Sequence, residues 1–600
     1  MRLPLRSFIL LVLTFSTAAF AGAAEPASAS SPVVWHAWSP EIFAQARREH
    51  KLVILDLEAV WCHWCHVMAE TTYVDPAVVA LLNEHYLAVR VDQDARPDIS
   101  NRYEDFGWPA TVIFAADGSE LVKRQGYVLP GPMARLLQAV VDDPTPGPSV
   151  GPESAPAATA ATATTLSVES RTALHAKWLE GYDDKEGGWG FSHKYLDWDA
   201  AELALREAAH GDARSEKMAR DTLRLQRKLI DPVWGGVYQY SAGGNWDEPH
   251  FEKIMQMQAE NLRLYSLAFA QWGDAADLAS AQAIHRYLRA FLTSPDGVVY
   301  TSQDADLVPG EHSADFFALD DASRRARGVP RIDTHSYARE NGWVIAALAQ
   351  FAAATGDARY TAEAERAARW VIAHRSLGGG GFRHDEKDAA GPYLGDTLAM
   401  GRAFLALHQL TQQREWLDRA EAAAKFIAAH FRRADGPGFA SSDTATAAFP
   451  APRPQFDENT GVARFASALS RVTGRAEHRA LAEQALRWVL SPDVIISRGL
   501  YLAPLLLAEE EARTEPLHVM IIGGRDDPAA QAMLAVALKI PTQHKVVELW
   551  DRRAGPAPRG EDYFPELPGA AAFLCANGSC SSPLPSAEAL QKRLAKSAKR

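Results

Sequence analysis

The sequence predicts a multidomain chain made of a small α/β domain, an all-α (α/α)6 toroid and a small α/β appendage. Strand and helix patterns alternate over residues 33–141, as in α/β domains. From residue 166 to residue 512 only helical periodicity is found, and strand patterns return after residue 515. The chain has 600 residues, which is long enough for about four domains of roughly 150 residues, or for fewer if one domain is a large toroid.

The first unit is placed at residues 32–141. A helical pattern over 41–50 precedes a buried strand at 52–57, and another helix begins after Trp61. Two more strands are predicted at 87–92 and 110–114, and Asp117-Gly118 is a hairpin turn into a fourth strand at 121–124. Residues 142–165 are rich in Pro, Gly, Ala, Ser and Thr and read as a linker.

The toroid is placed at residues 166–514. Roughly twelve amphipathic helices are predicted, starting near residues 166, 199, 215, 251, 275, 335, 358, 396, 415, 457, 476 and 498. Their connections alternate between short ones with Gly and long ones with Gly plus an aromatic residue. If the helices run up and down, every long loop lies on the same face. A closed ring with a loop-lined cleft is favoured over an open helical solenoid.

Strand patterns at 517–524 and 545–549, a helix from Pro528, and an apolar run at 569–574 predict the appendage, placed at residues 515–586. Residues 587–600 are expected to form a solvated basic tail. The net charge of −13 and a pI of about 5.8 argue against nucleic acid as a partner.

The N-terminus predicts an exported protein. Arg2 and Arg6 precede a short apolar run and small residues, which is the order of a secretory signal peptide over residues 1–24. In a Gram-negative host the destination would be the periplasm. An uncleaved anchor is the alternative, but after cleavage no segment approaches the about 20 apolar residues of a membrane span.

Four cysteines form two close pairs, which are too few for a disulfide scaffold. Cys62 and Cys65 follow a buried strand and open a helix, where the helix dipole and free N–H groups lower a thiol pKa. Cys62 is expected to be the nucleophile and Cys65 the resolving thiol, and His63 and His66 add positive charge.

Two further features surround this motif. Asp56 lies on the apolar strand, where burial raises a carboxyl pKa, and it is a candidate proton acceptor for Cys65. Trp108 and Pro109 precede the next strand, where a cis-proline can present backbone to a peptide. These residues resemble the thioredoxin fold. A structural disulfide and a zinc site of the cysteine pairs, or of Cys and His, are the alternatives; we expect neither a metal ion nor a cofactor.

The string WCHWCHVM at residues 61–68 resembles the spermatogenesis-associated protein 20-like family. Similar motifs are FGWP at 106–109, GGVY at 235–238, PHFEK at 249–253, SQDAD at 302–306 and CANGSC at 575–580. The resemblance implies a thioredoxin-like domain joined to a six-hairpin, glycosidase-like toroid that is similar in fold to N-acylglucosamine 2-epimerases. The chain departs from the family pattern at 254–258, where a Tyr-Asp-Asn-type stretch is usual, and over 307–343.

Long-loop residues are the candidates for chemistry in the toroid cleft. Paired acids and a histidine serve glycoside hydrolysis or proton abstraction beside a carbonyl. The candidates are His250, Glu252, Asp304, Asp306, Asp457 and Glu458, with Trp189, Tyr238 and Trp246 as rings for stacking on a sugar. The structural alternative makes Asp457 a helix N-cap and places Glu252 in a first helical turn.

Cys575 and Cys580 enclose the turn-forming Asn577-Gly578, so a disulfide across it is expected. It is either a static bridge or a relay for Cys62 and Cys65, and the relay requires the appendage to fold back over the first domain.

The leading hypothesis is an exported thiol–disulfide oxidoreductase that acts on protein thiols or disulfides, with a toroid that binds a partner or ligand. The alternative is a carbohydrate-active epimerase, isomerase or hydrolase with a regulatory thioredoxin-like domain and a sugar or other small ligand in the cleft. A third hypothesis is a binding protein whose toroid selects the redox partner.

Overall fold

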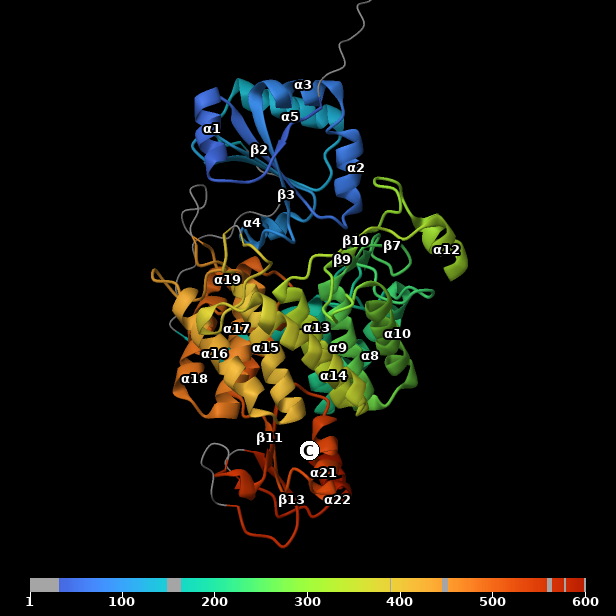
Figure 1. Cartoon of the computed structure of the whole chain (residues 1–600), viewed down its shortest axis with the longest axis vertical. Helices are drawn as coiled ribbons and strands as arrows, with labels where there is room; N and C mark the ends of the chain where they lie inside the picture. The colour runs from blue at the N-terminus through green and yellow to red at the C-terminus, as the bar shows by residue number, and fades with distance from the viewer. Residues whose placement is uncertain are drawn as a thin grey trace, which may run out of the picture.

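The computed structural model describes residues 32–147, 163–388, 390–444, 452–557, 564–576 and 579–597. Three bodies are stacked along the longest axis of the molecule (Figure 1). An α/β domain lies at one end, helices fill the middle, and a smaller α/β unit lies at the other end. The predicted fold class is therefore confirmed. The expected signal peptide and most of the linker lie outside the described residues.

The N-terminal domain is a five-stranded sheet with helices on both faces. Its elements are β1 (Trp35–His36), α1 (Glu41–Glu49), β2 (Leu52–Glu58), α2 (His63–Thr71), α3 (Pro76–His85), β3 (Tyr86–Asp92), α4 (Pro97–Tyr103), β4 (Ala110–Phe114), β5 (Glu120–Gln125) and α5 (Pro130–Asp142). The strand order is β1-β3-β2-β4-β5: β3 pairs in parallel with β1 and with β2, and β4 pairs antiparallel with β2 and with β5. Phe43 of α1 packs into the core on one face, and Met68 of α2 and Leu137 of α5 pack on the other.

The middle body is a closed double ring of helices. The inner helices are α7 (Trp198–Ala209), α9 (Met255–Trp272), α13 (Ala338–Thr355), α15 (Leu394–Thr411), α17 (Phe456–Thr473) and α20 (Ala503–Arg513). Each inner helix contacts the next, and α20 contacts α7, so the ring closes. The outer helices, each packed on an inner one, are α6 (Val168–Glu180), α8 (Ala213–Gln226), α10 (Ala275–Phe291), α14 (Ala358–Arg375), α16 (Arg414–His430) and α18 (Ala476–Val489). Closure excludes the open solenoid.

The long connections lie at the end of the ring that faces the N-terminal domain (Figure 1). They carry β6 (Tyr240–Ser241), β7 (Pro249–His250), β8 (Lys253–Ile254), β9 (Ser302–Gln303), β10 (Ile332–Asp333), α11 (Ala314–Phe317), α12 (Asp321–Arg327) and α19 (Pro492–Ser497). The β8–β9 pairing places Lys253 opposite Gln303, which brings two distant loops together. Gly236, in one such loop, has a φ of 77°, and a Cβ there would overlap the Tyr287 ring.

The C-terminal unit is a four-stranded sheet covered by two helices. It consists of β11 (Leu517–Ile522), α21 (Pro528–Leu538), β12 (Lys545–Trp550), β13 (Ala571–Ala576), β14 (Ser579–Cys580) and α22 (Ala587–Ser597), in the strand order β12-β11-β13-β14. The expectation of a solvated tail is wrong for residues 587–597, because α22 packs on α21 and buries Leu590. Among the described helices, none has the length and hydropathy that crossing a bilayer would need.

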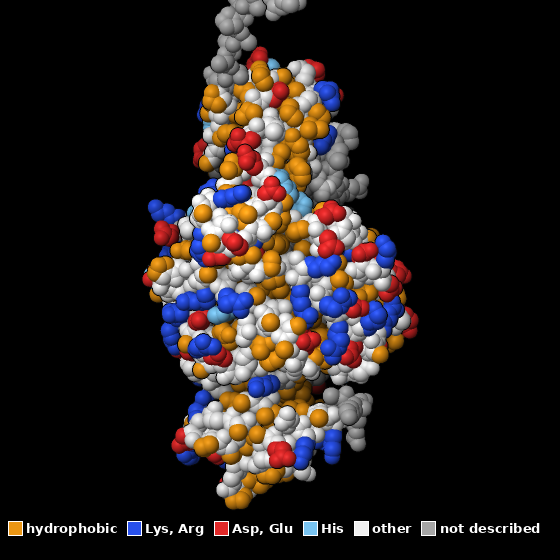
Figure 2. Space-filling view, turned by 90° about the vertical axis from the view of Figure 1, so that its right-hand side faces the viewer, with side chains coloured by type: hydrophobic (Ala, Val, Ile, Leu, Met, Phe, Trp, Pro, Cys, Tyr) orange, Lys and Arg blue, Asp and Glu red, His pale blue; other side chains and the backbone are white. Residues whose placement is uncertain are grey.

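The C-terminal unit also borders the far end of the ring. Residues 542–545 line a chamber of about 170 Å³ inside the toroid. Its walls are mostly small or apolar side chains of the inner helices, among them Ala346, Ala353, Ala406 and Leu410. Figure 2 shows the three bodies in contact, with a narrower waist between the toroid and the C-terminal unit and with histidine side chains at the surface of the upper junction.

Candidate functional site

The first cysteine pair lies where helix α2 begins. Cys62 is the N-cap residue of α2, and its Sγ accepts a hydrogen bond from the Cys65 N–H at 3.1 Å. The two residues form a disulfide, and each is only 3% exposed. After reduction, the dipole and free N–H groups of the helix start would stabilise a thiolate at this position.

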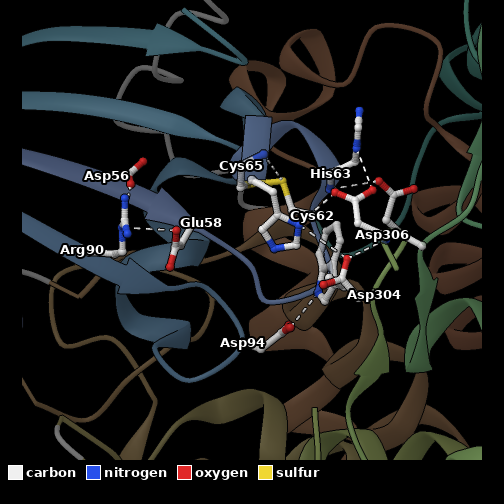
Figure 3. Close-up of a disulfide and its surroundings, with 12 residues drawn as sticks. Asp56, Glu58, Cys62, His63, Cys65, Arg90, Asp94, Asp304 and Asp306 are labelled. Atoms are coloured by element: carbon white, nitrogen blue, oxygen red, sulfur yellow. Dashed lines mark hydrogen bonds and ion pairs between the residues drawn. A yellow bond between two sulfur atoms is a disulfide. The ribbon is translucent and has the colours of Figure 1, made fainter. Parts of the chain in front are cut away.

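Toroid residues hold the histidines of α2. His63 Nδ1 lies 2.7 Å from Asp306 Oδ1 (Figure 3), and His66 Nδ1 lies 3.1 Å from Asp306 Oδ2. Burial alone would lower the pKa of each histidine, but the hydrogen bond and charge of Asp306 outweigh burial and raise both pKa values. The positive charge expected beside the cysteines is therefore favoured by a carboxylate from the other domain.

Asp304 and Glu252 adjoin the same cluster. Asp304 Oδ1 is 3.6 Å from His66 Nδ1, and burial raises the Asp304 pKa to about 6. Glu252 Oε1 accepts the backbone N–H of His63 at 3.4 Å, and burial raises the Glu252 pKa to about 7. The three motifs at residues 61–68, 249–253 and 302–306 thus converge in space although they are far apart in the chain.

His250 lies beside this cluster and is held neutral. Burial lowers its pKa to about 4, and neighbouring histidines, His63 first among them, lower it further. Its ring stacks on Tyr240 with the centroids 4.2 Å apart. A neutral imidazole in this position can accept a proton only weakly, so His250 is a poor general base in this conformation.

The disulfide is covered by large side chains. Trp61 and Trp108 pack around the cysteines from the N-terminal domain, and Ile254 of β8 packs over them from the toroid. The Trp108–Pro109 peptide bond is cis, and Pro109 precedes β4. Because these groups enclose both sulfur atoms, a partner reaches the disulfide only after side chains or loops move.

The docking of the two domains continues beyond α2. Trp61 Nε1 donates to Asp94 Oδ2 at 2.8 Å, and His384 Nε2 of the toroid lies 2.7 Å from the Asp94 carbonyl oxygen. His384 Nδ1 lies 2.8 Å from Asp396 Oδ1. Burial would lower the His384 pKa, but the adjacent Asp396 raises it to about 9, so His384 is charged at neutral pH.

Asp56 lies on β2 as expected and is buried. Burial raises its pKa, against the lowering effect of the Arg90 guanidinium, whose Nε is 3.0 Å from Asp56 Oδ2. Arg90 Nε also lies 3.3 Å from Glu58 Oε2, and burial raises the Glu58 pKa to about 7 (Figure 3). Neither Arg90 nor Glu58 was predicted. The parallel register, which places Asp56 opposite Arg90, is the signal that identifies the pair.

A cavity of about 340 Å³ lies between the N-terminal domain and the ring. Two of its tryptophans come from each domain: Trp61, Trp108, Trp198 and Trp343. Asp457 and Glu458 line it as the sequence predicts for cleft residues. The predicted cleft candidates therefore divide between two places, with Glu252, Asp304 and Asp306 beside the disulfide.

Asp457 and Glu458 lie in the first turn of α17. The N-cap is Gln455, whose side chain accepts the Glu458 N–H, so the alternative of Asp457 as N-cap is wrong. Burial raises the pKa of Glu458 to about 7. Asn101 of the N-terminal domain donates to Glu458 Oε1 at 3.3 Å.

The rings proposed for stacking on a sugar are buried elsewhere. Trp246 is 2% exposed and donates to the carbonyl of Glu186 at 2.9 Å, while Trp189 and Tyr238 are 3% and 4% exposed. None of the three lines the inter-domain cavity. That prediction is wrong because glycine-rich loops fold these rings into the wall of the toroid instead of presenting them.

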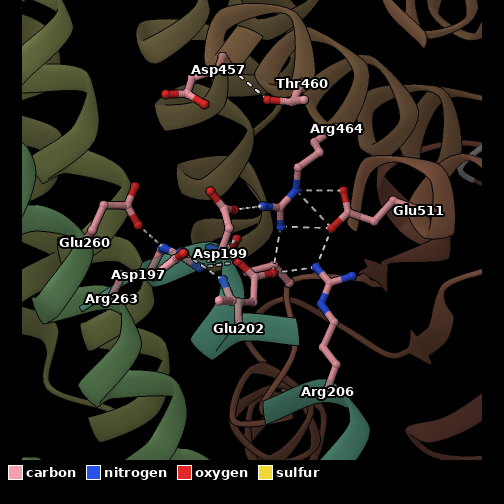
Figure 4. A network of polar contacts seen from close by, with 12 residues as sticks. Asp197, Asp199, Glu202, Arg206, Glu260, Arg263, Asp457, Thr460, Arg464 and Glu511 are labelled. Atoms are coloured by element: carbon pink, nitrogen blue, oxygen red, sulfur yellow. Dashed lines mark hydrogen bonds and ion pairs between the residues drawn. The ribbon is translucent and has the colours of Figure 1, made fainter. Parts of the chain in front are cut away.

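A buried ionic network forms the floor of the cavity (Figure 4). Arg464 contacts Asp199, Glu202 and Glu511 at 2.9, 2.6 and 3.0 Å. Arg263 joins the network through Glu202 at 2.8 Å. Burial raises the Asp199 pKa to about 7. The sequence offers no local pattern for this network, because its members belong to four inner helices, α17, α20, α7 and α9, that are distant in sequence and successive in the ring.

The second disulfide, Cys575–Cys580, joins β13 and β14 in the C-terminal unit. This unit and α2 lie at opposite ends of the molecule, with the toroid between them (Figure 1). The fold-back that a relay requires is absent from the described structure, so the relay hypothesis is wrong for this conformation. The turn at Asn577-Gly578 lies outside the described residues.

Comparisons with known proteins agree with the N-terminal fold. The family model Thioredox_DsbH, described as a protein of unknown function, DUF255, matches residues 26–134. Spermatogenesis-associated protein 20 of Homo sapiens is 28% identical over an alignment of 313 positions that covers 47% of this chain and 40% of that protein. The resemblance to that family is thereby confirmed, and this chain spans less than half the length of that relative.

Two further similarities concern separate parts of the chain. Thiol:disulfide interchange protein DsbD 1 of Pseudomonas aeruginosa is 31% identical over an alignment of 137 positions that covers 18% of this chain and 23% of that protein. A crystal structure of D-mannose isomerase aligns with a TM-score of 0.43 and 13% identity, covering 58% of this chain and 98% of that one.

Proposed function

We propose that the chain is a thiol–disulfide oxidoreductase in which Cys62 is the nucleophile and Cys65 the resolving thiol. The observation that carries the proposal is the Cys62–Cys65 disulfide at the N-cap of α2, with the Cys65 N–H donating to the Cys62 sulfur. A thioredoxin-like sheet and the cis bond before Pro109 surround it. The relative named as a thiol:disulfide interchange protein is consistent with this chemistry.

In the reduced chain, the Cys62 thiolate attacks one sulfur of a substrate disulfide and expels the other sulfur as a thiolate. The Cys65 thiolate then attacks Cys62 in the mixed disulfide, which releases the second substrate thiol and closes the Cys62–Cys65 bond. Two electrons pass to the substrate, and the two protons of the dithiol end on the two product thiols. The reverse sequence oxidises a substrate dithiol.

The toroid belongs to the redox site, because Ile254, Asp304 and Asp306 close over α2. We propose that protein thiols or disulfides react when the loops at residues 249–254 and 302–310 withdraw from the disulfide. The toroid then controls which partners reach Cys62. This is the selecting role that the third hypothesis gives to the toroid.

The decisive experiment traps the mixed disulfide. A Cys65→Ser chain retains Cys62 but cannot resolve, so it should accumulate covalent adducts through Cys62, whereas Cys62→Ser should form none. For the unmodified chain, we expect a reduction potential between about −270 and −120 mV, the range of thioredoxin-fold oxidoreductases. A value below about −300 mV together with an unreactive Cys62 would identify a structural disulfide and refute the proposal.

Export by the signal peptide at residues 1–24 is part of the proposal. The test is N-terminal sequencing of the chain recovered from the exported fraction. A new N-terminus near residue 22 or 25 supports export, and an intact Met1 in a chain retained inside the cell contradicts it.

As a second candidate function, we propose that the inter-domain cavity binds a sugar or a similar polar ring. The observation that favours it is the set of four tryptophans around Glu458 and Asp199, whose pKa values of about 7 suit acid–base work near neutral pH. Epimerisation, isomerisation or hydrolysis would then use these two carboxyl groups.

Tryptophan fluorescence tests this second function. Sugar-dependent quenching should be weakened by Trp343→Phe, because Trp343 lines the cavity. Trp370 on outer helix α14 does not line the cavity, so Trp370→Phe is the matched control. Equal quenching in both variants, or none in the unmodified chain across a panel of mono- and disaccharides, would count against a sugar site.

A further inference from the structure

We propose that His66, Asp304 and Asp306 form a binding site for a divalent transition-metal ion such as Zn²⁺ at the junction of the N-terminal domain and the toroid. Thiol–disulfide exchange needs no such ion, so this site adds to the proposed redox function and does not depend on it. No metal was expected from the sequence, because Asp306 follows His66 by 240 residues and the pattern of ligands is not local.

The positions of the three ligand atoms fit a metal ion. One atom from each residue lies within 4.8 Å of the others. His66 Nδ1 is 3.1 Å from Asp306 Oδ2 and 3.6 Å from Asp304 Oδ1. Tetrahedral coordination with bonds of about 2.0–2.2 Å separates neighbouring ligand atoms by roughly 3.3–3.6 Å. An ion between these atoms would therefore require only small side-chain movements.

The donor set selects the class of ion. One imidazole nitrogen and two carboxylate oxygens suit zinc and neighbouring first-row metals better than Ca²⁺, which prefers six to eight oxygen ligands. Three protein ligands also leave a fourth position open to water or another ligand.

The backbone holds both aspartates in place before any ion binds. The Asp306 N–H donates to Asp304 Oδ1, and the Gly310 N–H donates to Asp306 Oδ2, each at 2.9 Å. Both side chains are nearly completely buried. Because the loop fixes these oxygens, a cation would meet a formed site with little further ordering cost.

Two neighbouring residues support the assignment. His63 Nδ1 lies 2.7 Å from Asp306 Oδ1, the oxygen that does not face His66, so His63 orients the carboxylate in the way that outer hydrogen bonds orient metal ligands. Glu252, which is 3% exposed, uses Oε1 to accept the His63 N–H, and its Oε2 has no hydrogen-bond partner among the described residues. A buried carboxylate oxygen without a donor beside this cluster is an independent sign that a cation belongs there.

The competing explanation is a protonated His66 that bridges two aspartates with no metal. The two cases differ in one measurable consequence. A metal ion would join α2 to the toroid and stabilise the docked form in proportion to its free concentration, whereas an ion pair would be indifferent to added metal.

The test uses the full chain with both disulfides intact, freed of metal with a chelator and titrated with Zn²⁺ by calorimetry. Elemental analysis after dialysis counts the bound ions. We expect one Zn²⁺ per chain. Asp304→Asn should lose more affinity than the about 10- to 100-fold that loss of an outer-shell partner typically costs, and His63→Asn should fall within that range.

Three controls complete the test. His285→Asn removes a histidine whose Nε2 lies 2.8 Å from Glu363 in the toroid, and it should bind Zn²⁺ as the unmodified chain does. The His66 side chain is less buried than that of Asp304, so His66→Gln provides a second ligand variant if Asp304→Asn fails to fold. A Cys62→Ser/Cys65→Ser chain should keep the site.

The proposal is overturned if the unmodified chain binds no Zn²⁺, if folded Asp304→Asn and His66→Gln bind it as tightly as the unmodified chain, or if only loss of the cysteines abolishes binding. None of these outcomes changes the result of the mixed-disulfide experiment, so the metal site and the redox function are tested independently.

Discussion

Arg464 is the residue whose removal the structure allows us to evaluate most fully. Its guanidinium is buried and reaches three carboxylates of α7 and α20 at 2.6–3.0 Å. Arg464→Met retains most of the aliphatic part of the side chain and removes the charge, which leaves Glu511 with Arg206 and leaves Glu202 with Arg206 and Arg263. Breaking a buried ion pair by removing one partner costs about 3–5 kcal/mol.

Glu511 gives an independent magnitude. Burial would raise its pKa, but Arg464 and then Arg206 lower it from 4.5 to about 2. A carboxylate with this depressed pKa contributes about 3 kcal/mol of stability at neutral pH. Since Arg206 remains, we expect Arg464→Met to lower the free energy of unfolding by about 3 kcal/mol at pH 7, at the lower end of the range for buried pairs.

The pH dependence supplies the sign. Stability from a carboxylate with a depressed pKa is present above its ordinary pKa of 4.5 and is lost as the pH falls toward the folded value of about 2. The unmodified chain loses this contribution on acidification, whereas Arg464→Met has already lost most of it. The difference between the two chains should therefore shrink by about 1 kcal/mol between pH 7 and pH 3.5.

Urea unfolding followed by tryptophan fluorescence measures both quantities. Arg359→Met is the matched control, because Arg359 lies 2.6 Å from Asp357 but its side chain is 80% exposed. An exposed pair contributes little, so the control should keep its urea midpoint. Equal stability of Arg464→Met and the unmodified chain at pH 7, or a difference that grows on acidification, would refute this reasoning.

Three further outcomes are expected. The pKa of His384 is raised to about 9, so its contribution to domain docking is fully present below pH 6.5 and is lost as the pH rises through about 9. The melting temperature of His384→Gln should therefore change less between pH 6.5 and pH 9 than that of the unmodified chain. A left-handed backbone costs an alanine about 1–2 kcal/mol, and Gly211→Ala, which has open space around its Cβ, should lower the free energy of unfolding by only this amount. Gly236→Ala should lower it by more, because its Cβ meets an aromatic ring, and urea unfolding measures both variants. Replacing Cys575 and Cys580 by serine should leave the reduction potential of the N-terminal disulfide unchanged in glutathione buffers, and a shift above about 30 mV would contradict the separation of the two pairs.

Local pattern was enough to predict most helices and strands. Helices predicted to begin near residues 275, 358 and 476 begin there, and the predicted strands at 87–92 and 545–549 differ from β3 and β12 by one residue at one end. Hydrophobic periodicity determines these elements because each buries one face against its neighbours. Alternating loop lengths were also sufficient to predict a closed ring, which the contact of α20 with α7 confirms.

Contacts between distant segments were beyond the same reasoning. The motif at 61–68 predicts a redox helix but carries no sign that Asp306 would pair with His63 and His66. Choosing stacking rings failed for a related reason: Trp246 and Trp343 look alike in sequence, and only the packing of loops decides which faces the cavity. Such choices depend on the tertiary arrangement, which local propensity does not encode.

A different unit borders the interior of the toroid at each end. The N-terminal domain lines the cavity at one end, and residues 542–545 line the chamber at the other. Movement of either unit relative to the ring would therefore change the access of a ligand to these spaces. A mutation that lowers only the barrier to this movement, and leaves the cavity lining unchanged, should accelerate binding and release by the same factor and leave the equilibrium affinity unchanged. Association and dissociation rates of a ligand would then detect a change in domain docking that leaves the dissociation constant unaltered.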